Sequence, residues 1–252
     1  MLNRYDAATL RAMFAEAGTL ALLERKGFDD LEVVIDCAGR ALPHTLLLGR
    51  KHGVRHVLLD AILGEAVVGT EFFARRGCAI ERPVELLVVY WLREEDPTAT
   101  FAADRPALPL QHHPGLGVLR SAFRVAVQIA SELGKDGVAS CPKFFHDAVI
   151  FFRSRLFLFL DGEEQGRFEA LHRDLRSLAL GDASLAILTG CVRGTDGAVA
   201  QWTPSFLVCP LSPRLTDYLH APGYADLVER SFMASHFTLD GDQWRDARKV
   251  AW

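Results

Sequence analysis

Cysteine is scarce and scattered in this sequence. The 252 residues contain five cysteines, and no two of them form a CxxC pair or the spacing of a zinc site. An odd number of dispersed cysteines indicates reduced, mostly buried thiols in a cytoplasmic protein, and it argues against a disulfide framework. The residues are Cys37, Cys78, Cys141, Cys191 and Cys209.

Long apolar runs are missing as well. The longest are broken by charged residues well short of the roughly 20 residues that cross a bilayer, and the N-terminus lacks a basic start followed by an apolar run. We therefore expect a cytoplasmic protein with no signal peptide and no membrane partner. Walker-type loops, serine-centred nucleophile elbows and internal repeats are also missing, which disfavours P-loop enzymes and hydrolases.

Charge of one sign is not concentrated in this chain. Its formal net charge is -4, which provides no general attraction to nucleic acid or to acidic membranes. Half of the residues are hydrophobic and 24% are charged, as in a globular protein. We expect a partner that is small or of mixed charge, and no nucleic acid.

The first ninety residues predict a helix and several strands. Apolar residues recur at helical spacing at the start of the chain, and alternating or β-branched runs follow it. The strand near residue 90 is the strongest in the chain, because it is dense in valine, leucine, tyrosine and tryptophan. The predicted elements are a helix over Ala7–Lys26 with Asp6 as its N-cap, a strand over Leu31–Cys37, a hairpin of Thr45–Leu48 and Val54–Leu59, and a strand over Val84–Leu92.

The central part of the sequence combines a glycine-containing loop with a helix. Residues 111–117 read Gln-His-His-Pro-Gly-Leu-Gly and open directly into an apolar segment. The first turn of a helix has free backbone N–H groups and a positive dipole, and glycines let the backbone approach a phosphate closely. A tight turn before a core helix has the same pattern, so both interpretations stay open.

The segment after this loop predicts an amphipathic helix. Its apolar face includes Leu119, Phe123 and Ala126, and Gly134 is a candidate C-terminal cap. A short buried strand over Val138–Cys141 and a second helix over Phe144–Arg155 follow. Loop, helix, strand and helix together form a unit of the α/β type.

The order of elements over about residues 30–160 resembles the GNAT acyltransferases, the Gcn5-related N-acetyltransferases. In that family a mixed sheet is splayed near its middle and acyl-CoA lies in the opening. A loop of the pattern Arg/Gln-x-x-Gly-x-Gly/Ala holds the pyrophosphate through backbone N–H groups. Here the corresponding residues are His112-His113-Pro114-Gly115-Leu116-Gly117, with Gln111 one position early. Residues 146–152 are similar in texture to a later family segment, although not in register.

The resemblance implies a co-substrate, which is acetyl-CoA or another acyl-CoA, and no metal. It also implies a small-molecule or peptide amine as the acceptor. The residues that would contact the co-substrate are Gln111, His112, Gly115, Leu116, Gly117 and Val118.

Direct attack of the amine on the thioester, which the resemblance implies, requires a base for the amine and an acid for the leaving thiolate. A backbone N–H near the end of Val84–Leu92 would stabilise the oxyanion. The candidate acid–base residues are Glu85, Glu94, Glu95, His112 and His113. Each also has a structural interpretation: the glutamates as solvated strand residues, and the histidines as packing or ligand contacts.

One feature of the family has no counterpart in this chain. The tyrosine that often serves as general acid is missing, since Phe151 and Phe152 occupy that neighbourhood. A second hypothesis therefore stays open: a catalytically inactive relative that binds a CoA-like ligand or a protein partner.

The sequence contains two other groupings of reactive residues. Cys141 with His146 could form a thiol nucleophile, but a small buried hydrophobic residue is the commoner role of such a cysteine. His44, His52 and His56 with Asp60 could be drawn as a metal site, but strand geometry separates them. We expect no metal.

The last ninety residues predict further elements beyond the acyl-CoA-binding core of residues 1–160. They are an amphipathic helix over Glu163–Leu180, a hairpin of Ala183–Val192 and Ala198–Val208, and short helices over Leu215–Tyr218 and Tyr224–Phe232. We expect this extension, residues 161–252, to pack on the core or to form a homodimer contact. The predicted fold is α/β, with a GNAT-like mixed central sheet flanked by helices and a C-terminal helix–hairpin extension.

Overall fold

The structure is a computed structural model that describes residues 4–38, 42–102 and 104–250. It has α/β architecture, with a mixed sheet flanked by helices. The chain divides into two compact units. The first contains the described residues of Met1–Val68, Val84–Ala107 and Gln111–Ala139, and the second contains Gly69–Pro83, Leu108–Leu110 and the described residues from Ser140 onward.

The first unit is built on a sheet in the order β1-β2-β3-β4-β5. Antiparallel pairing joins β1 to β2, β2 to β3 and β3 to β4. The backbone N–H of Asp136 donates to the carbonyl of Glu85 at 2.7 Å, so β5 begins beside the start of β4 and runs in the same direction. The strands are β1 (Asp29–Asp36), β2 (His44–Lys51), β3 (Val54–Val68), β4 (Val84–Glu94) and β5 (Gly137–Ser140).

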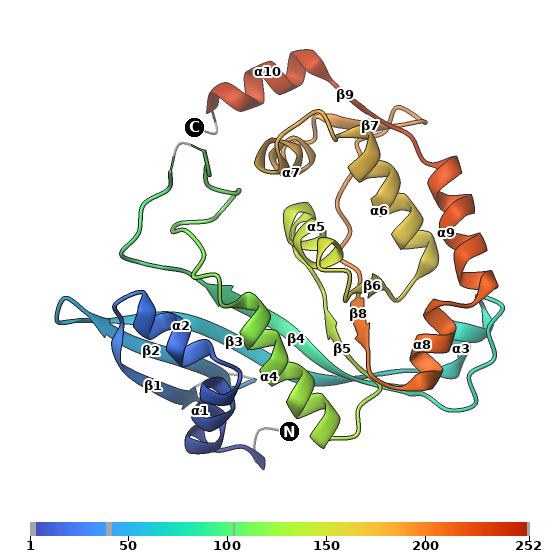
Figure 1. Cartoon of the computed structure of the whole chain (residues 1–252). Coiled ribbons are helices and arrows are strands. Elements are labelled where there is room, and N and C mark those ends of the chain that lie inside the picture. The colour runs from blue at the N-terminus through green and yellow to red at the C-terminus, as the bar shows by residue number, and fades with distance from the viewer. Residues whose placement is uncertain (1–3, 39–41, 103, 251–252) are drawn as a thin grey trace. The chain divides into compact units, whose positions relative to one another are not determined.

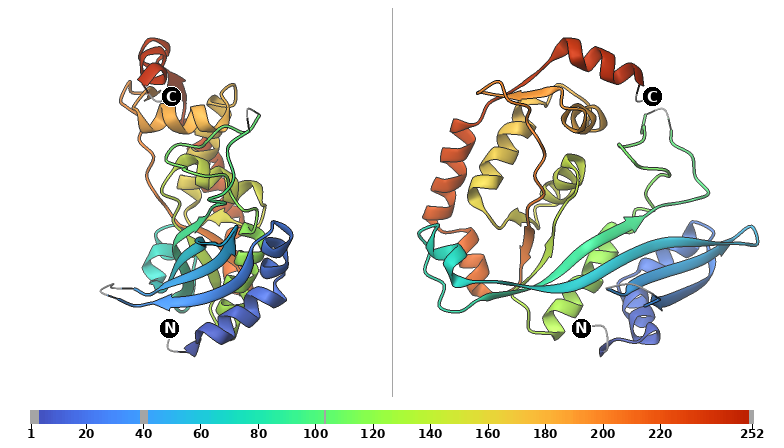
Figure 2. Two further views of the ribbon diagram at one scale, coloured as in Figure 1. Left: turned by 90° about the vertical axis from the view of Figure 1, so that its left-hand side faces the viewer. Right: turned by 180° about the vertical axis from the view of Figure 1, so that it is seen from behind.

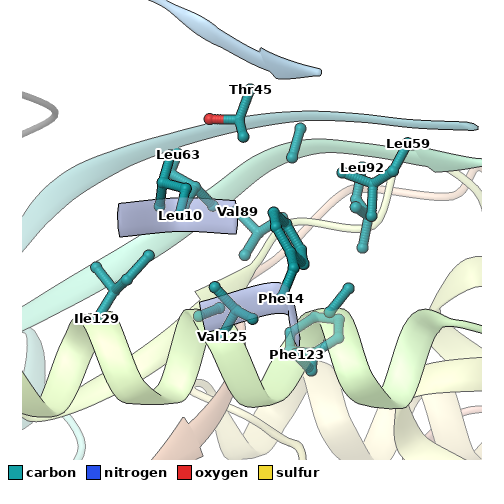
Figure 3. A pocket seen from close by; sticks show the side chains of 13 residues that line it. Leu10, Phe14, Thr45, Leu59, Leu63, Val89, Leu92, Phe123, Val125 and Ile129 are labelled. Carbon is teal, nitrogen blue, oxygen red and sulfur yellow. The ribbon is translucent and has the colours of Figure 1, made fainter. Parts of the chain in front are cut away.

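Helices α1 (Ala7–Glu16) and α4 (Leu119–Glu132) cover one face of this sheet (Figures 1 and 2). Figure 3 shows their apolar side chains pointing toward those of β2, β3 and β4 around a small cavity. The one polar residue lining the cavity is Thr45, whose buried Oγ1 has no hydrogen-bond partner among the described residues. The residues that line the cavity are Leu10, Phe14, Thr45, Leu59, Ala61, Leu63, Val89, Leu92, Ala122, Phe123, Val125, Ala126 and Ile129.

The sequence predicted the strands of this unit well, but one helix differs. The segment predicted as a single helix over Ala7–Lys26 is two helices, α1 and α2 (Thr19–Arg25). Gly18 lies between them with φ +81°, a left-handed conformation that interrupts a helix and that glycine adopts without strain. The predicted hairpin is confirmed, and its second strand continues to Val68.

The second unit combines short strands with helices. Strands β6 and β8 pair antiparallel, and β7 pairs antiparallel with β9. Helices α6 and α9 lie side by side (Figure 1). The elements are α3 (Thr70–Ala74), α5 (Phe145–Arg153), β6 (Leu158–Phe159), α6 (Gly162–Asp174), α7 (Leu180–Leu188), β7 (Val192–Gly194), β8 (Leu207–Pro210), α8 (Pro213–Leu219), α9 (Pro222–Ala234), β9 (Phe237–Leu239) and α10 (Gly241–Val250).

The predicted hairpin of Ala183–Val192 and Ala198–Val208 is wrong. Most of its first half is helix α7, because an apolar run of this length fits a buried helix as well as a strand. The turn itself is real, since the Gly194 N–H donates to the carbonyl of Ala198 at 2.9 Å. The predicted helix over Glu163–Leu180 also ends early, at Asp174.

Across the part of the chain that is described, no helix combines the length and the apolar character needed to cross a membrane.

Candidate anion-binding site

The loop before α4 is tied to the end of β4 within the first unit. The backbone N–H of Asp96 donates to the carbonyl of Pro114 at 2.7 Å. Gly117 has φ +70°, and α4 begins two residues later. This positive φ turns the chain sharply into the helix, and the first N–H groups of the helix have no carbonyl four residues back to bond to.

The anion in front of these N–H groups is a carboxylate of the chain itself. The side chain of Glu94, the last residue of β4, lies close to the backbone N–H groups of Val118, Leu116 and Gly117, which act to lower the pKa of its carboxyl group. A Cβ atom added to Gly115 would lie only 3.0 Å from the Glu94 Oε1 atom, so the carboxylate rests directly against the loop backbone. We call Leu116, Gly117 and Val118 the nest. A carboxylate of the chain itself thus lies against the loop that was predicted to bind a phosphate.

Burial dominates the electrostatics of Glu94. Loss of hydration raises the pKa of its carboxyl group from 4.5 to about 6, although the nest N–H groups and the charge of Lys26 act to lower it. The Oε2 atom is buried and has no hydrogen-bond partner within the described ranges. The nest thus replaces only part of the hydration that the carboxylate loses on burial.

Two lysines from separate turns add positive charge near this end of the sheet. Lys26 follows α2, and Lys51 ends β2 with its Nζ 4.8 Å above the ring of Phe28. Burial acts to raise the pKa of Asp96, but hydrogen bonds from Thr98 and the charges of Lys51 and Lys26 lower it overall. No sequence pattern links these two lysines to the loop, because they lie on different turns of the chain.

The predicted site residues separate into two places. Glu94 and the loop come together, whereas Glu85 lies at the other end of β4, about 30 Å away at the rise of an extended strand. Glu85 is 54% exposed, and its Oε2 atom lies 3.0 Å from the Nζ of Lys135. Lys135 also pairs with Glu65 at 2.6 Å. Glu85 therefore belongs to a structural ion-pair cluster, and we no longer place it at the ligand site.

The residues just before the nest differ in their exposure to solvent. His112 is exposed, and Gln111 and His113 are half-buried. All three belong to the first unit and lead directly into Pro114 and Gly115. They stay candidate residues.

The structure disfavours the thiol nucleophile in the second unit. Burial raises the pKa of Cys141, so its thiol is protonated near neutral pH. The Nδ1 atom of His146 lies 2.7 Å from the hydroxyl of Ser184, and burial lowers the pKa of His146 to about 4. Both ring and hydroxyl are buried, so the pair satisfies its own hydrogen bonds inside the unit.

The histidines of the possible metal site, His44 and His56, do not lie close together. His44 is hydrogen bonded to Asp60 at 2.7 Å, and Trp91 donates to the same carboxylate at 3.2 Å. His56 pairs with Gly49, five residues further along β2 than His44, so the two histidines are about 17 Å apart along the strand.

Neither a protein-family model nor a curated protein matches this sequence. The assignment of the site rests on its own geometry.

The raised pKa of Glu94 predicts a pH-dependent stability. The folded protein binds more protons than the unfolded chain between pH 4.5 and 6, so the stabilising contribution is present below pH 4.5 and is lost as pH rises through about 6. Glu94→Gln mimics the protonated form. We expect the variant to exceed the wild type by roughly 1–2 kcal/mol in free energy of unfolding at pH 8, measured by urea denaturation.

The comparison at low pH is the control for this prediction. At pH 4.5 the two proteins should differ by much less, because the wild-type side chain is then mostly protonated. A wild type that is the more stable protein at pH 8 would show that the charged carboxylate is favourable in the nest.

Proposed function

We propose that the protein is an acyl-CoA-dependent N-acyltransferase that binds the pyrophosphate of its co-substrate at the nest. The observation that supports this most directly is the position of the Glu94 carboxylate at the start of α4, where its Oε1 atom would lie 3.0 Å from a Cβ added to Gly115. An arrangement that accepts a carboxylate has the donors and the dipole that a phosphate needs.

The position of the nest in the sheet supports the same proposal. Ligands of open α/β sheets bind outside the carboxyl ends of parallel strands. Glu94 is the last residue of β4, and β5 runs parallel to β4. The nest therefore lies at the end of the sheet where a ligand is expected.

The proposed reaction is direct transfer from the thioester to an amine. The amine nitrogen attacks the thioester carbonyl, the C–S bond breaks, and the proton lost by the amine is balanced by protonation of the CoA thiolate. His112 and His113 are the candidate bases beside the loop, since a neutral imidazole nitrogen can accept a proton. Glu94 is engaged by the nest, so in this arrangement it does not face an acceptor.

A second candidate function is binding without catalysis. Two observations favour it: the nest is already filled by Glu94, and phenylalanines stand where the related enzymes often have a tyrosine. In this case the same loop would hold a CoA-like ligand, or would be a purely internal contact.

Calorimetric titration with CoA and with acetyl-CoA tests binding. We expect dissociation constants in the micromolar range for both ligands. No heat at millimolar ligand would contradict the proposed function and would leave the nest as an internal contact.

Release of free CoA thiol in the presence of amines separates the two candidate functions. We expect thiol release that depends on the amine and that falls when both His112 and His113 are replaced by alanine. Binding without amine-dependent thiol release, over a panel of small amines and peptides, would favour the non-catalytic protein.

A further inference from the structure

The small cavity between the sheet and the helices of the first unit is lined in part by small side chains. Ala61 of β3 lies on one side of it, and Ala122 and Ala126 of α4 lie on the other. Residues four apart in a helix lie on the same face, so the two helical alanines together leave space opposite the strand. The cavity has a volume of about 30 Å³. This is roughly twice the space that one water molecule needs.

A single side-chain hydroxyl lies in the wall of this cavity. Among the described residues that line it, Thr45 alone has a polar side chain, and Figure 3 shows it on the strand side, with α4 opposite. Thr45 is 4% exposed, and its Oγ1 atom has no hydrogen-bond partner within the described ranges. A buried hydroxyl without a partner destabilises a fold, whereas valine would fill the same shape without a polar atom. A hydroxyl can both donate and accept, so it can hold the polar atom of a ligand.

The chemistry of the lining decides between a water molecule and an organic ligand. A buried water usually makes about three hydrogen bonds, and this wall offers it one side-chain partner. The other lining side chains belong to leucine, phenylalanine, alanine, valine and isoleucine, and they favour a molecule with an apolar body.

We propose that this cavity binds a small neutral molecule with an apolar body and one hydrogen-bonding group, of the class of the short-chain alcohols. The volume limits such a ligand to about two or three non-hydrogen atoms. Its polar group bonds to the Thr45 hydroxyl, and its alkyl part lies among apolar side chains of α1, β3 and α4. No residue of the nest lines the cavity, so the proposal does not depend on acyl-CoA binding.

Ethanol is the probe, because it combines an ethyl body with one hydroxyl. Methyl NMR spectra of the full chain, labelled at leucine, valine and isoleucine, follow its titration. We expect saturable shifts at Leu63, Val125 and Ile129, with a dissociation constant in the millimolar range, which is the best that so small a ligand reaches. The exposed Val54 and Val67 report general solvent effects. Shifts that do not saturate, or that are equal at both sets of methyl groups, would overturn the proposal.

Thr45→Val tests the hydrogen bond, because it keeps the shape of the side chain and removes the hydroxyl. We expect ethanol to bind about fivefold more weakly to this variant. Xenon enters apolar cavities without forming a hydrogen bond, so its affinities for the two proteins should agree within about twofold. Equal ethanol affinity in the two proteins, or an equal loss for ethanol and xenon, would contradict the role of the hydroxyl and with it the proposal.

Ala61→Val tests the location, because the added methyl groups occupy the cavity. We expect the ethanol-induced shifts to disappear, with the folded state confirmed by thermal denaturation. Ala66→Val is the matched control, since it makes the same substitution on β3 at a position that does not line the cavity, and we expect it to bind ethanol like the wild type. Ethanol binding that is unchanged in folded Ala61→Val, or lost equally in both variants, would place the ligand elsewhere and refute the proposal. If Ala61→Val does not fold, the comparison of ethanol with xenon in Thr45→Val decides by itself.

Discussion

Replacement of Gly115 by valine should reduce CoA affinity by at least about 100-fold. The added Cβ would lie 3.0 Å from the Glu94 Oε1 atom, so the valine side chain would fill the place in which a phosphate must sit. Loss of two charge-assisted hydrogen bonds from the nest to phosphate accounts for an effect of this size, which corresponds to about 2.8 kcal/mol. Calorimetric titration with CoA measures it directly.

Gly223→Val is the control for this variant. Gly223 is exposed on α9, and in the described structure no heavy atom lies within 4 Å of an added Cβ. We expect its CoA affinity to equal that of the wild type. Micromolar CoA binding by a folded Gly115→Val protein would show that CoA binds elsewhere, and the loop would then be a structural turn.

Replacement of Gly166 by alanine should destabilise the second unit by about 2–3 kcal/mol. Gly166 lies where α6 packs against α9, and its added Cβ would meet the carbonyl oxygen of Val228 at 2.2 Å and the nitrogen of Phe232 at 2.8 Å. These are backbone atoms, so the helices must move apart. The cost of such overpacking exceeds the gain of about 1 kcal/mol in helix propensity.

Urea denaturation followed by circular dichroism tests the Gly166→Ala prediction. Gly223→Ala is the matched control, because it makes the same substitution in an open position of α9. At this position only the higher helix propensity of alanine changes the stability. We therefore expect a free energy of unfolding that is unchanged or up to about 1 kcal/mol higher than that of the wild type. Equal stability of the two variants would mean that α6 and α9 are less closely packed than the structure shows.

Local pattern was sufficient for most elements of the first unit, although not for the break between α1 and α2. The β2–β3 hairpin was predicted because its polar reversal lies between two apolar runs, and His52 and Gly53 have the positive φ values of such a turn. The helix α4 was predicted from its apolar face, of which Ala126 and Ile129 are buried. In both cases the prediction depends on residues close together in the sequence. The spacing of their apolar side chains matches the period of the helix or strand that they form.

Long-range pairing could not be predicted in the second unit. The sequence paired the strand near Val192 with the segment after Gly197, and an antiparallel bridge between Arg193 and Val199 confirms this local pairing. The pairing of β7 with β9, more than forty residues further along, was not predicted. The helix α7 was predicted as a strand, because its short apolar run does not distinguish the two periods. Packing with α5 within the unit selects the helix.

A glycine-containing loop that opens into an apolar helix could be predicted from neighbouring residues, with an anion site and a tight turn both open as its role. The contact of this loop with the Glu94 carboxylate is visible only in the folded chain. Glu94 lies more than twenty residues before the nest, and as a residue near the end of a strand it was predicted as a candidate base. The antiparallel pairing of β3 with β4 and the bond between Asp96 and Pro114 bring its carboxylate onto the loop. Every residue except proline has the same backbone N–H group, so no pattern of side chains in the sequence could identify the carboxylate that these groups face.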